Sequence, residues 1–314
     1  MPPKILVISG PTASGKTRLA VELALRHGGE VVSADSMQVY RRMDIGTAKP
    51  TPEEMRGIPH HMLDVADPEE DFSVARYVEL AAPCVDDILA RGKLPIVAGG
   101  TGLYLDSLLS GRTFAPFSPD GGLRARLEAR FDQVGGEAML AELSKVDPDS
   151  AQRLHPNDKK RIVRALEVFQ QTGKSISQHN RETRALPLRY DALTLSLAFQ
   201  RREDMWARID RRVDEMMAAG LAEEVRALLD SGVPVRCTAM QAIGYKEMAA
   251  ALRGGGDVCA AAEEITLRSR QYAKRQLTWF RRTEGAKWLF WGPEPDFEAA
   301  CRTSTKYLEE FGLV

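Results

Sequence analysis

The sequence lacks three features that would place it in a specialised class of protein. It has no net excess of positive charge, since 43 Lys and Arg residues are balanced by 44 Asp and Glu, so any nucleic-acid surface must be a local patch. It has no apolar run of membrane-spanning length and no signal-peptide pattern, and we therefore expect a cytoplasmic protein without a membrane partner. Its only cysteines are Cys84, Cys237, Cys259 and Cys301. Because they are far apart and form no C-x-x-C pair, neither a zinc site nor a disulfide framework is expected.

Residues 4–17 contain the most specific motif, an apolar run followed by the pattern G-x-x-x-x-G-K-T. The run Ile5–Ser9 is typical of a strand buried on both faces of a parallel sheet, and a helix is expected from about Lys16 to Arg26. The Gly-rich turn between them directs backbone N–H groups into one cavity, which predicts binding of a diphosphate or triphosphate. Lys16 would contact the outer phosphate oxygens, and the Thr17 hydroxyl would ligate Mg²⁺. The predicted site comprises Gly10, Pro11, Thr12, Ala13, Ser14, Gly15, Lys16 and Thr17.

Two further strands are expected to end at the same edge of the sheet. Glu30–Ala34 leads to Asp35, and Leu94–Ala98 leads through glycines to Thr101. The carboxyl ends of parallel strands frame the ligand crevice, so Asp35 should lie near the bound phosphates as a catalytic group, a turn cap or a water-mediated Mg²⁺ ligand. Thr101 either donates to a phosphate or leaving-group oxygen or caps the next helix.

Residues 112–188 are expected to form an inserted helical domain, because charged residues alternate with Ala and Leu at helical spacing. Basic residues are concentrated between positions 153 and 164, where Asp158 is the only acid. Such a run is either a solvated helix face or a phosphate-binding surface. Its cations are Arg153, His155, Lys159, Lys160, Arg161 and Arg164, and a second set is Arg124, Arg126 and Arg130.

The remainder, residues 1–111 and 189–314, is predicted to be an α/β core with a P-loop NTPase-like parallel sheet flanked by helices. Ala192–Phe199 and Lys287–Trp291 would add two strands, and helices are expected at Arg202–Leu229, Met240–Leu252 and Asp257–Arg282. The last helix carries no acid between Arg268 and Arg282 but six cations, for which an RNA or phosphate role is predicted. They are Arg268, Arg270, Lys274, Arg275, Arg281 and Arg282. Trp279 and Phe280 are assigned to packing, the commoner role of helical aromatics.

Taken together, the motifs carry a family resemblance over nearly the whole chain. The blocks are the P-loop at 10–17, Ser33–Tyr40, Asp44–Pro50, Gly99–Tyr104, His155–Asp158, Arg161–Glu167, Gln241–Lys246 and Lys274–Arg281. Their content, order and spacing resemble those of the bacterial tRNA dimethylallyltransferases. The resemblance implies a monomer that transfers a dimethylallyl group from dimethylallyl diphosphate to the exocyclic amine of the tRNA adenosine immediately 3′ to the anticodon, with Mg²⁺.

The resemblance also implies roles for individual residues. Asp35 would hold the weakly nucleophilic adenine amine and accept its proton. Thr101, Lys16 and the arginine that matches the family's R-I-x-x-R pattern, Arg212, would stabilise the departing diphosphate. Because the adenine cannot react while stacked in the anticodon loop, it would be flipped out. Contact with tRNA is implied for Asp35, Ser36, Met37, Gln38, Thr101, Arg124, Lys160, Arg161, Ile162, Val163, Arg164, Gln241, Gly244, Tyr245, Lys246, Lys274, Arg275, Gln276, Trp279 and Arg281.

Three other functions are compatible with a P-loop. A small-molecule kinase would bind ATP in it, but the strand-end Asp that commonly holds Mg²⁺ in such enzymes is absent, and a basic helical insert would be unnecessary. An isopentenyltransferase that acts on free nucleotides would share the P-loop and Asp35 without needing two basic helices. A noncatalytic RNA-binding protein gated by a nucleotide is the third alternative.

Overall fold

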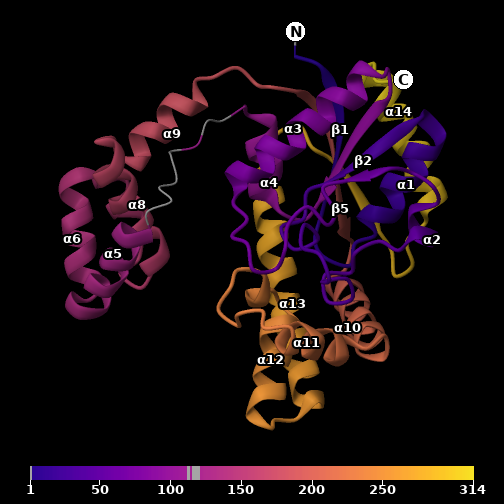
Figure 1. The fold of residues 1–314 in the computed structure, drawn as a ribbon. Helices are drawn as coiled ribbons and strands as arrows, with labels where there is room; N and C mark the ends of the chain where they lie inside the picture. The colour runs from indigo at the N-terminus through magenta and orange to yellow at the C-terminus, as the bar shows by residue number, and fades with distance from the viewer. Residues whose placement is uncertain (1, 112–113, 115–120) are drawn as a thin grey trace. The chain divides into compact units, whose positions relative to one another are not determined.

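The computed structural model describes residues 2–111, 114 and 121–314, and contains a six-stranded parallel sheet (Figure 1). The strands are β1 (Lys4–Ser9), β2 (Gly29–Ser33), β3 (His60–His61), β4 (Leu94–Gly99), β5 (Asp191–Phe199) and β6 (Lys287–Trp291). Their order across the sheet is β3-β2-β4-β1-β5-β6, and every pair is parallel. The predicted strands and the P-loop type of α/β fold are confirmed.

Helices cover the sheet because its central strands are apolar on both faces. In β1, residues 5–8 are at most 1% exposed. Helix α1 (Lys16–His27) packs on the sheet together with α14 (Phe297–Phe311), while α3 (Val74–Ala90) packs with α4 (Gly102–Leu109) (Figure 1). The short helix α2 (Pro52–Met55) precedes β3. A helix after Thr101 was one of the two alternatives raised by the sequence, and α4 is that helix, whereas the sequence patterns did not indicate α2 or α14.

Two of the predicted C-terminal helices are each interrupted at a glycine. The helix expected over Arg202–Leu229 is two helices, α10 (Arg202–Ala218) and α11 (Leu221–Asp230), because Gly220 has a left-handed φ of 97°. Similarly, Met240–Leu252 divides into a 3₁₀ turn, η1 (Ala239–Gln241), and helix α12 (Tyr245–Gly254), with φ 100° at Gly244. Helix α13 (Val258–Phe280) is continuous, as predicted. It packs against α10 and α12 and also reaches α4.

The chain contains a second compact unit, Ser110–Leu188, whose described residues form only helices. These are α5 (Gly121–Val134), α6 (Gly136–Val146), α7 (Pro148–Arg153), α8 (Lys159–Thr172) and α9 (Ile176–Arg184). They enclose a core of their own, built around Leu127, Met139, Leu143, Ile162 and Leu166. The first unit, Met1–Leu109 with Arg189–Val314, resumes directly after the insertion, since the Arg189 N–H donates to Leu109 O at 2.9 Å.

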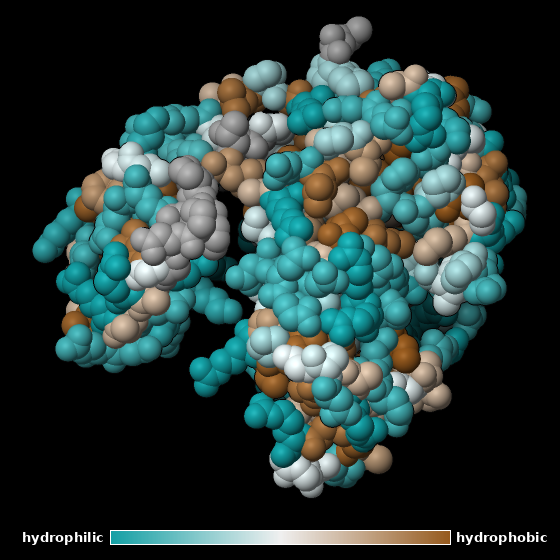
Figure 2. Space-filling view, in the orientation of Figure 1, coloured by the Kyte–Doolittle hydropathy of each residue, from teal (hydrophilic) through white to brown (hydrophobic). Residues whose placement is uncertain are grey.

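Hydrophilic residues cover most of the visible surface, and hydrophobic ones lie between them in scattered groups (Figure 2). Among the helices that the structure describes, none is long and apolar enough to cross a bilayer.

Candidate active site

The loop between β1 and α1 has the geometry of a phosphate cradle. Gly15 adopts φ 81°, and a Cβ at Gly10 would lie 2.9 Å from Leu197 O, so both glycines are required by the turn. The backbone N–H groups of Gly15, Lys16 and Thr17 have no acceptor among the residues that the structure describes. Unpaired N–H groups at a helix N-terminus attract an anion, as predicted for this loop.

The loop is held in place by residues from distant parts of the chain. Gln276 on α13 is 6% exposed; its Oε1 accepts from the Thr12 N–H at 2.9 Å, and its Nε2 donates to Gly100 O at 2.9 Å. Trp291 on β6 donates from Nε1 to Ser14 O at 2.8 Å. Phe297 packs so closely on Gly15 that a Cβ there would lie 2.7 Å from its ring. These supports were not identified from the sequence, because no local pattern reveals partners more than 250 residues away.

The cations predicted to bind the diphosphate lie close enough to affect one another. Burial, followed by the charge of Arg212, lowers the pKa of Lys16 to about 7, while Asp35 acts to raise it. Burial also lowers the pKa of Arg212, and Asp35 and Glu54 counteract this effect. The Arg212 Nε is buried and has no hydrogen-bond partner in the described part of the chain. Lys16 and Arg212 are both partly desolvated and share Asp35 as a nearby carboxylate, and a bound anion would stabilise both cations further.

Asp35 lies at the end of β2, as predicted, and forms a turn with the residues that follow it. Its Oδ1 accepts from the backbone N–H groups of Met37 at 2.9 Å and Gln38 at 3.4 Å. Thr101, at the end of β4, accepts from the Ser36 N–H at 3.0 Å and donates to Ser36 Oγ at 3.3 Å. The Thr101 hydroxyl therefore bonds to the Asp35 turn, across adjacent strands, and not to the start of α4.

The sequence analysis missed two polar side chains beside Asp35. Tyr272 on α13 is half-buried, and burial, followed by the charge of Asp35, raises the pKa of Tyr272 to about 12. Tyr104 on α4 is buried, and burial raises its pKa, with Tyr40 and Asp35 contributing. A phenol that keeps its proton can donate a hydrogen bond. Tyr272 lies two residues before Lys274, just outside the block that carries the family resemblance.

Comparison with known proteins settles the family. A family model described as IPP transferase matches residues 38–283, and one described as isopentenyl transferase matches residues 3–70. The chain is 51% identical over 289 residues to tRNA dimethylallyltransferase 1 of Trichlorobacter lovleyi, covering 92% of this chain and 94% of the relative. It is 45% identical to the tRNA dimethylallyltransferase of Acetivibrio thermocellus, with 98% of each chain covered. The chain belongs to the tRNA dimethylallyltransferase family.

Solved structures of the family agree with this fold. The tRNA isopentenylpyrophosphate transferase of Bacillus halodurans superposes with a TM-score of 0.72 at 41% identity, covering 98% of this chain and 96% of the other. A eukaryotic dimethylallyltransferase acting on tRNA superposes with a TM-score of 0.82 at 30% identity, covering 98% of this chain and 78% of the other. The predicted family, fold class and enzyme class are thereby confirmed.

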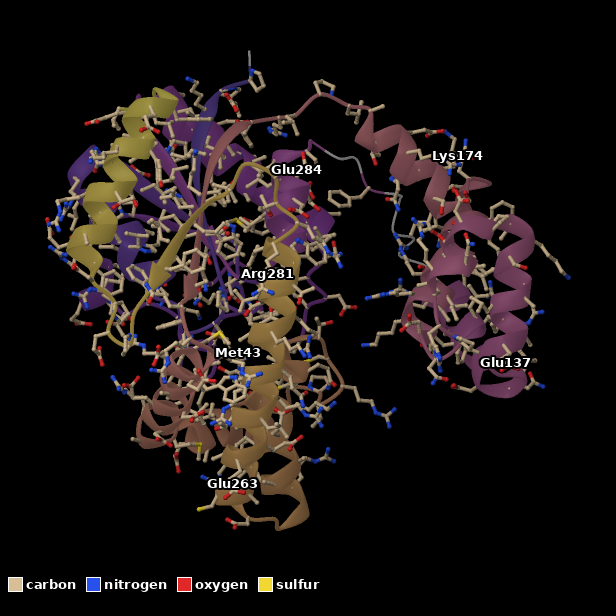
Figure 3. All side chains as sticks on the ribbon, turned by 180° about the vertical axis from the view of Figure 1, so that it is seen from behind. Met43, Glu137, Lys174, Glu263, Arg281 and Glu284 are labelled. Atoms are coloured by element: carbon tan, nitrogen blue, oxygen red, sulfur yellow. The ribbon has the colours of Figure 1, made fainter. Side chains whose placement is uncertain are left out.

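Helix α13 divides its residues between the surface and the phosphate loop. Glu263 lies near the start of the helix and Arg281 directly follows its end (Figure 3). Lys274 and Arg275 are exposed. Trp279 is 39% exposed, donates from Nε1 to Asp106 at 3.1 Å and packs on Gly102, so the prediction that it serves packing is only part of its role. Phe280 is 2% exposed and packs as predicted.

Several residues with implied tRNA contact have buried side chains in this structure, so any contact they make with RNA would involve the backbone. Ile162 and Val163 are at most 1% exposed in the core of the helical unit. Tyr245 is fully buried, as is the backbone of Gly244 beside it, and Gln276 is occupied by the phosphate loop. The resemblance implied tRNA contact for whole motif blocks, so these buried residues were included with their exposed neighbours. In α8, the helical spacing of apolar residues would have separated them.

Some of the predicted basic residues are paired with acids. In the helical unit, Arg124 and Arg164 both bond to the buried Glu167, at 2.8 and 2.7 Å, and Lys159 bonds to Asp132 at 2.5 Å. On α13, Arg268 pairs with Glu264 at 2.6 Å, and Arg270 with Asp210 at 2.5 Å. The excess of positive charge noted in these stretches of sequence is therefore reduced by acids from other turns and helices. Lys160, Arg161, Gln241, Lys246, Lys274, Arg275 and Arg281 remain exposed.

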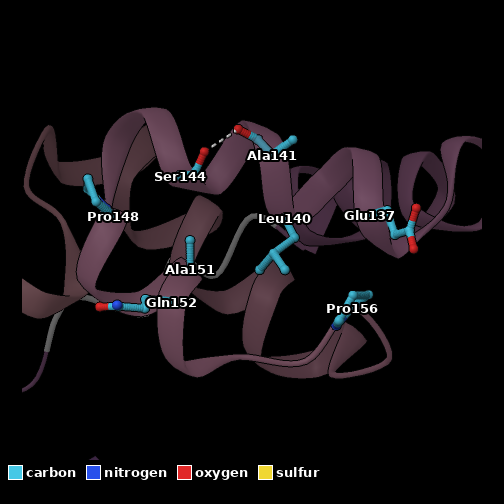
Figure 4. Close-up of a pocket in the computed structure, with 8 residues that line it drawn as sticks. All are labelled: Glu137, Leu140, Ala141, Ser144, Pro148, Ala151, Gln152 and Pro156. Carbon is cyan, nitrogen blue, oxygen red and sulfur yellow. Dashed lines mark hydrogen bonds between the residues drawn. The ribbon is translucent and has the colours of Figure 1, made fainter.

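A shallow, open depression in the helical unit is lined mostly by apolar groups from α6 and α7 (Figure 4). Its lining residues are Glu137, Leu140, Ala141, Ser144, Pro148, Ala151, Gln152 and Pro156. It contains none of the predicted catalytic residues and has no group suited to phosphate binding.

Replacing Gln276 with Ala is expected to lower the free energy of unfolding by about 1–3 kcal/mol, because the Thr12 N–H and Gly100 O would lose their partner. The freed loop should also bind inorganic diphosphate more weakly. Thermal unfolding and calorimetric titration with diphosphate measure the two effects. Gln271→Ala, an exposed position on the same helix, is the matched control and should change neither quantity. Equal behaviour of the two variants would contradict the bridging role.

Proposed function

We propose that this enzyme transfers the dimethylallyl group of dimethylallyl diphosphate to the exocyclic amine of the tRNA adenosine immediately 3′ to the anticodon, releasing diphosphate in the cytoplasm. The observation that carries the proposal is the convergence of Asp35 with Lys16 and Arg212 beside a phosphate cradle. The names of the relatives, which include a dimethylallyltransferase acting on tRNA, supply the group transferred and its acceptor.

Asp35 suits the role of the base because its orientation is fixed before substrate binds. Both backbone donors of its turn bond to Oδ1, so Oδ2 has no protein donor among the described residues. The adenine amine is a poor nucleophile because its lone pair is delocalised into the ring. As its nitrogen forms the bond to the first carbon of the dimethylallyl group, Asp35 would take the proton that the nitrogen loses.

The departing diphosphate needs positive charge around it, because the carbon–oxygen bond breaks and its electron pair stays on the diphosphate oxygen. Lys16, Arg212 and the unpaired N–H groups of the loop would stabilise this charge. Thr101 would contribute a hydroxyl at the end of the adjacent strand. Groups that the fold itself holds at the site of developing charge need little reorganisation during the reaction.

The residues also fit a Mg²⁺ ion. The Thr17 hydroxyl opens α1 in a half-buried position, and the described residues contain no cluster of three or more His, Cys, Asp or Glu that could bind a metal alone. Mg²⁺ commonly takes one or two protein oxygens and completes its shell with phosphate oxygens and water. Thr17 would hold the ion, which would supply further neutralisation of the diphosphate charge.

The tRNA would be bound by the exposed cations of α13 and α8, with Trp279 offering a partly exposed ring on which a base can stack. The single experiment that tests the function is incubation with labelled dimethylallyl diphosphate and either unmodified tRNA or free AMP. Label should appear in tRNA alone and should be confined to the adenosine next to the anticodon. Label in AMP would favour the free-nucleotide transferase, and a requirement for ATP hydrolysis would favour the kinase.

The affinity for tRNA is expected to depend steeply on salt, because each phosphate neutralised by a cation releases counterions. Lys274→Ala with Arg275→Ala, and separately Lys160→Ala with Arg161→Ala, should each make the slope of log affinity against log salt shallower by about 0.7 per lost contact. Binding measured across a salt series gives the slope.

Arg268→Ala is the control for this experiment, because it removes one charge from α13 at a position already paired with Glu264. Its slope should match that of the unmodified protein. Unchanged slopes in both double variants, with the fold intact, would mean that these cations are solvated surface charges and do not contact tRNA phosphates.

A further inference from the structure

The loop Met43–Lys49 is anchored by a single carboxylate from a distant helix. On α11, Glu224 Oε2 accepts from the N–H groups of Asp44 and Ile45, both at 2.9 Å, and Oε1 accepts from the Gly46 N–H at 3.2 Å. Three successive backbone donors converging on one carboxylate form an anion-binding nest that is filled by the protein's own side chain. Hydrogen bonds to a charged acceptor are stronger than neutral ones, so this is a firm attachment.

A second residue completes the anchor from the first turn of α12. Tyr245 is fully buried and donates its hydroxyl to Glu224 Oε1 at 2.5 Å. Its ring packs against Gly46 so tightly that a Cβ there would lie 2.4 Å from the ring. Burial, followed by the charge of Glu224, raises the pKa of Tyr245 well above its usual range, so the phenol remains a donor. Glu224 thus accepts four hydrogen bonds, two on each oxygen.

The anchored loop in turn holds the side chain of Gln38. Its Nε2 donates to Thr47 O at 3.3 Å and Ala48 O at 3.0 Å, while its Oε1 accepts from Ser33 Oγ at 3.1 Å. The backbone N–H of the same residue donates to Asp35 Oδ1. Hydrogen bonds, linked by the backbone of the loop and by Gln38 itself, therefore connect Glu224 to the carboxylate of Asp35.

We propose that Glu224 is a positioning residue for the transfer reaction: with Tyr245, it fixes the loop Met43–Lys49, which orients Gln38 and thereby the Asp35 turn. The inference rests on the proposed role of Asp35. Glu224 contacts neither the phosphate loop nor any predicted tRNA contact that is exposed. We therefore expect Glu224 to affect proton transfer to Asp35 and not the binding of diphosphate.

Glu224→Gln tests this directly, because the amide has the same shape but would direct an NH₂ group at two of the four donors. Misplacement of the Asp35 turn should lower kcat by roughly 10- to 100-fold. The KM for dimethylallyl diphosphate should stay within about twofold, since the P-loop is untouched. Glu223→Gln is the matched control: the neighbouring side chain is exposed, pairs with Arg226 at 3.7 Å on the same helix, and its replacement should leave both parameters unchanged.

A double-mutant cycle distinguishes positioning from general destabilisation. In a Gln38→Ala background, where the connection to Asp35 is already broken, Glu224→Gln should cause little further loss of kcat. Tyr245→Phe removes one donor without changing the charge, and should reproduce the same kcat-specific defect at smaller size, even if Glu224→Gln folds poorly.

An unchanged kcat in both Glu224→Gln and Tyr245→Phe, fully additive losses with Gln38→Ala, or a loss that appears mainly as a higher KM for dimethylallyl diphosphate would each overturn the proposal. Failure of the proposed function is a separate result. It would appear as an absence of label transfer to tRNA by the unmodified protein and by Glu223→Gln.

Discussion

Asp35→Asn is expected to lower turnover by roughly 10²- to 10⁴-fold, the range for loss of a positioned general base. Asn keeps the shape of the side chain and an oxygen that can accept from the Met37 N–H, so the turn should persist. What it loses is the ability to accept a proton from the adenine amine. Single-turnover rates with labelled dimethylallyl diphosphate measure the chemical step directly.

The affinities serve as controls for this variant. The tRNA dissociation constant should change little, because the proposed RNA contacts are spread over the exposed cations and Trp279. The affinity for inorganic diphosphate should also be retained, since the Gly15–Thr17 N–H groups are unaltered. A large loss of tRNA affinity with a normal single-turnover rate would mean that Asp35 binds RNA and does not take part in proton transfer.

Lys16→Ala is expected to reduce kcat/KM for dimethylallyl diphosphate by about 10²- to 10³-fold, because it removes a charge directed at the departing diphosphate. The KM of the unmodified enzyme for dimethylallyl diphosphate should also depend on pH. Below about pH 7, Lys16 is protonated in the free enzyme and binds the anion fully. Above it, the ammonium is lost and KM should rise by at most about tenfold per pH unit.

Lys16→Arg separates the effect of losing the Lys16 proton from the effect of losing a cation at this position. A guanidinium stays protonated throughout this range, so the rise in KM above pH 7 should disappear even if the absolute rate falls. Persistence of the same rise in Lys16→Arg would assign the titration to another group, such as the substrate phosphate. Arg212 remains charged in both enzymes and supplies a constant background.

The sequence predicts the central elements of the fold because their signals are local. The apolar run before Gly10 and the helical pattern after Lys16 each lie within one element, and both are where expected. The boundaries within α10–α12 were missed because Gly220 and Gly244 were not recognised as helix ends. In both places, the apolar spacing continues across the interruption.

The site was predicted as a set of residues but not as an arrangement. Asp35, Lys16 and Arg212 are brought together as expected, whereas Gln276 was assigned to RNA and in fact supports the phosphate loop. Glu167 was named only as the end of a motif block and was given no role, although it pairs with two predicted RNA-binding arginines from a buried position. Such pairings depend on which helices pack together, and no spacing in the chain encodes them.

The hydrogen bond between Arg189 and Leu109 has a consequence for how the chain folds. Strands β1 and β5 are neighbours, yet the helical unit separates them in sequence. The chain leaves the first unit at Leu109 and re-enters it at Arg189, and these two residues are joined by one hydrogen bond. Once the core of the helical unit has formed, that unit therefore acts as a short closed loop. Its helices make mostly local contacts and so can form quickly, whereas parallel pairing of β1 with β5 must wait. A folded insertion therefore lowers the entropic cost of bringing β1 and β5 together, compared with an insertion of the same length that is still unfolded.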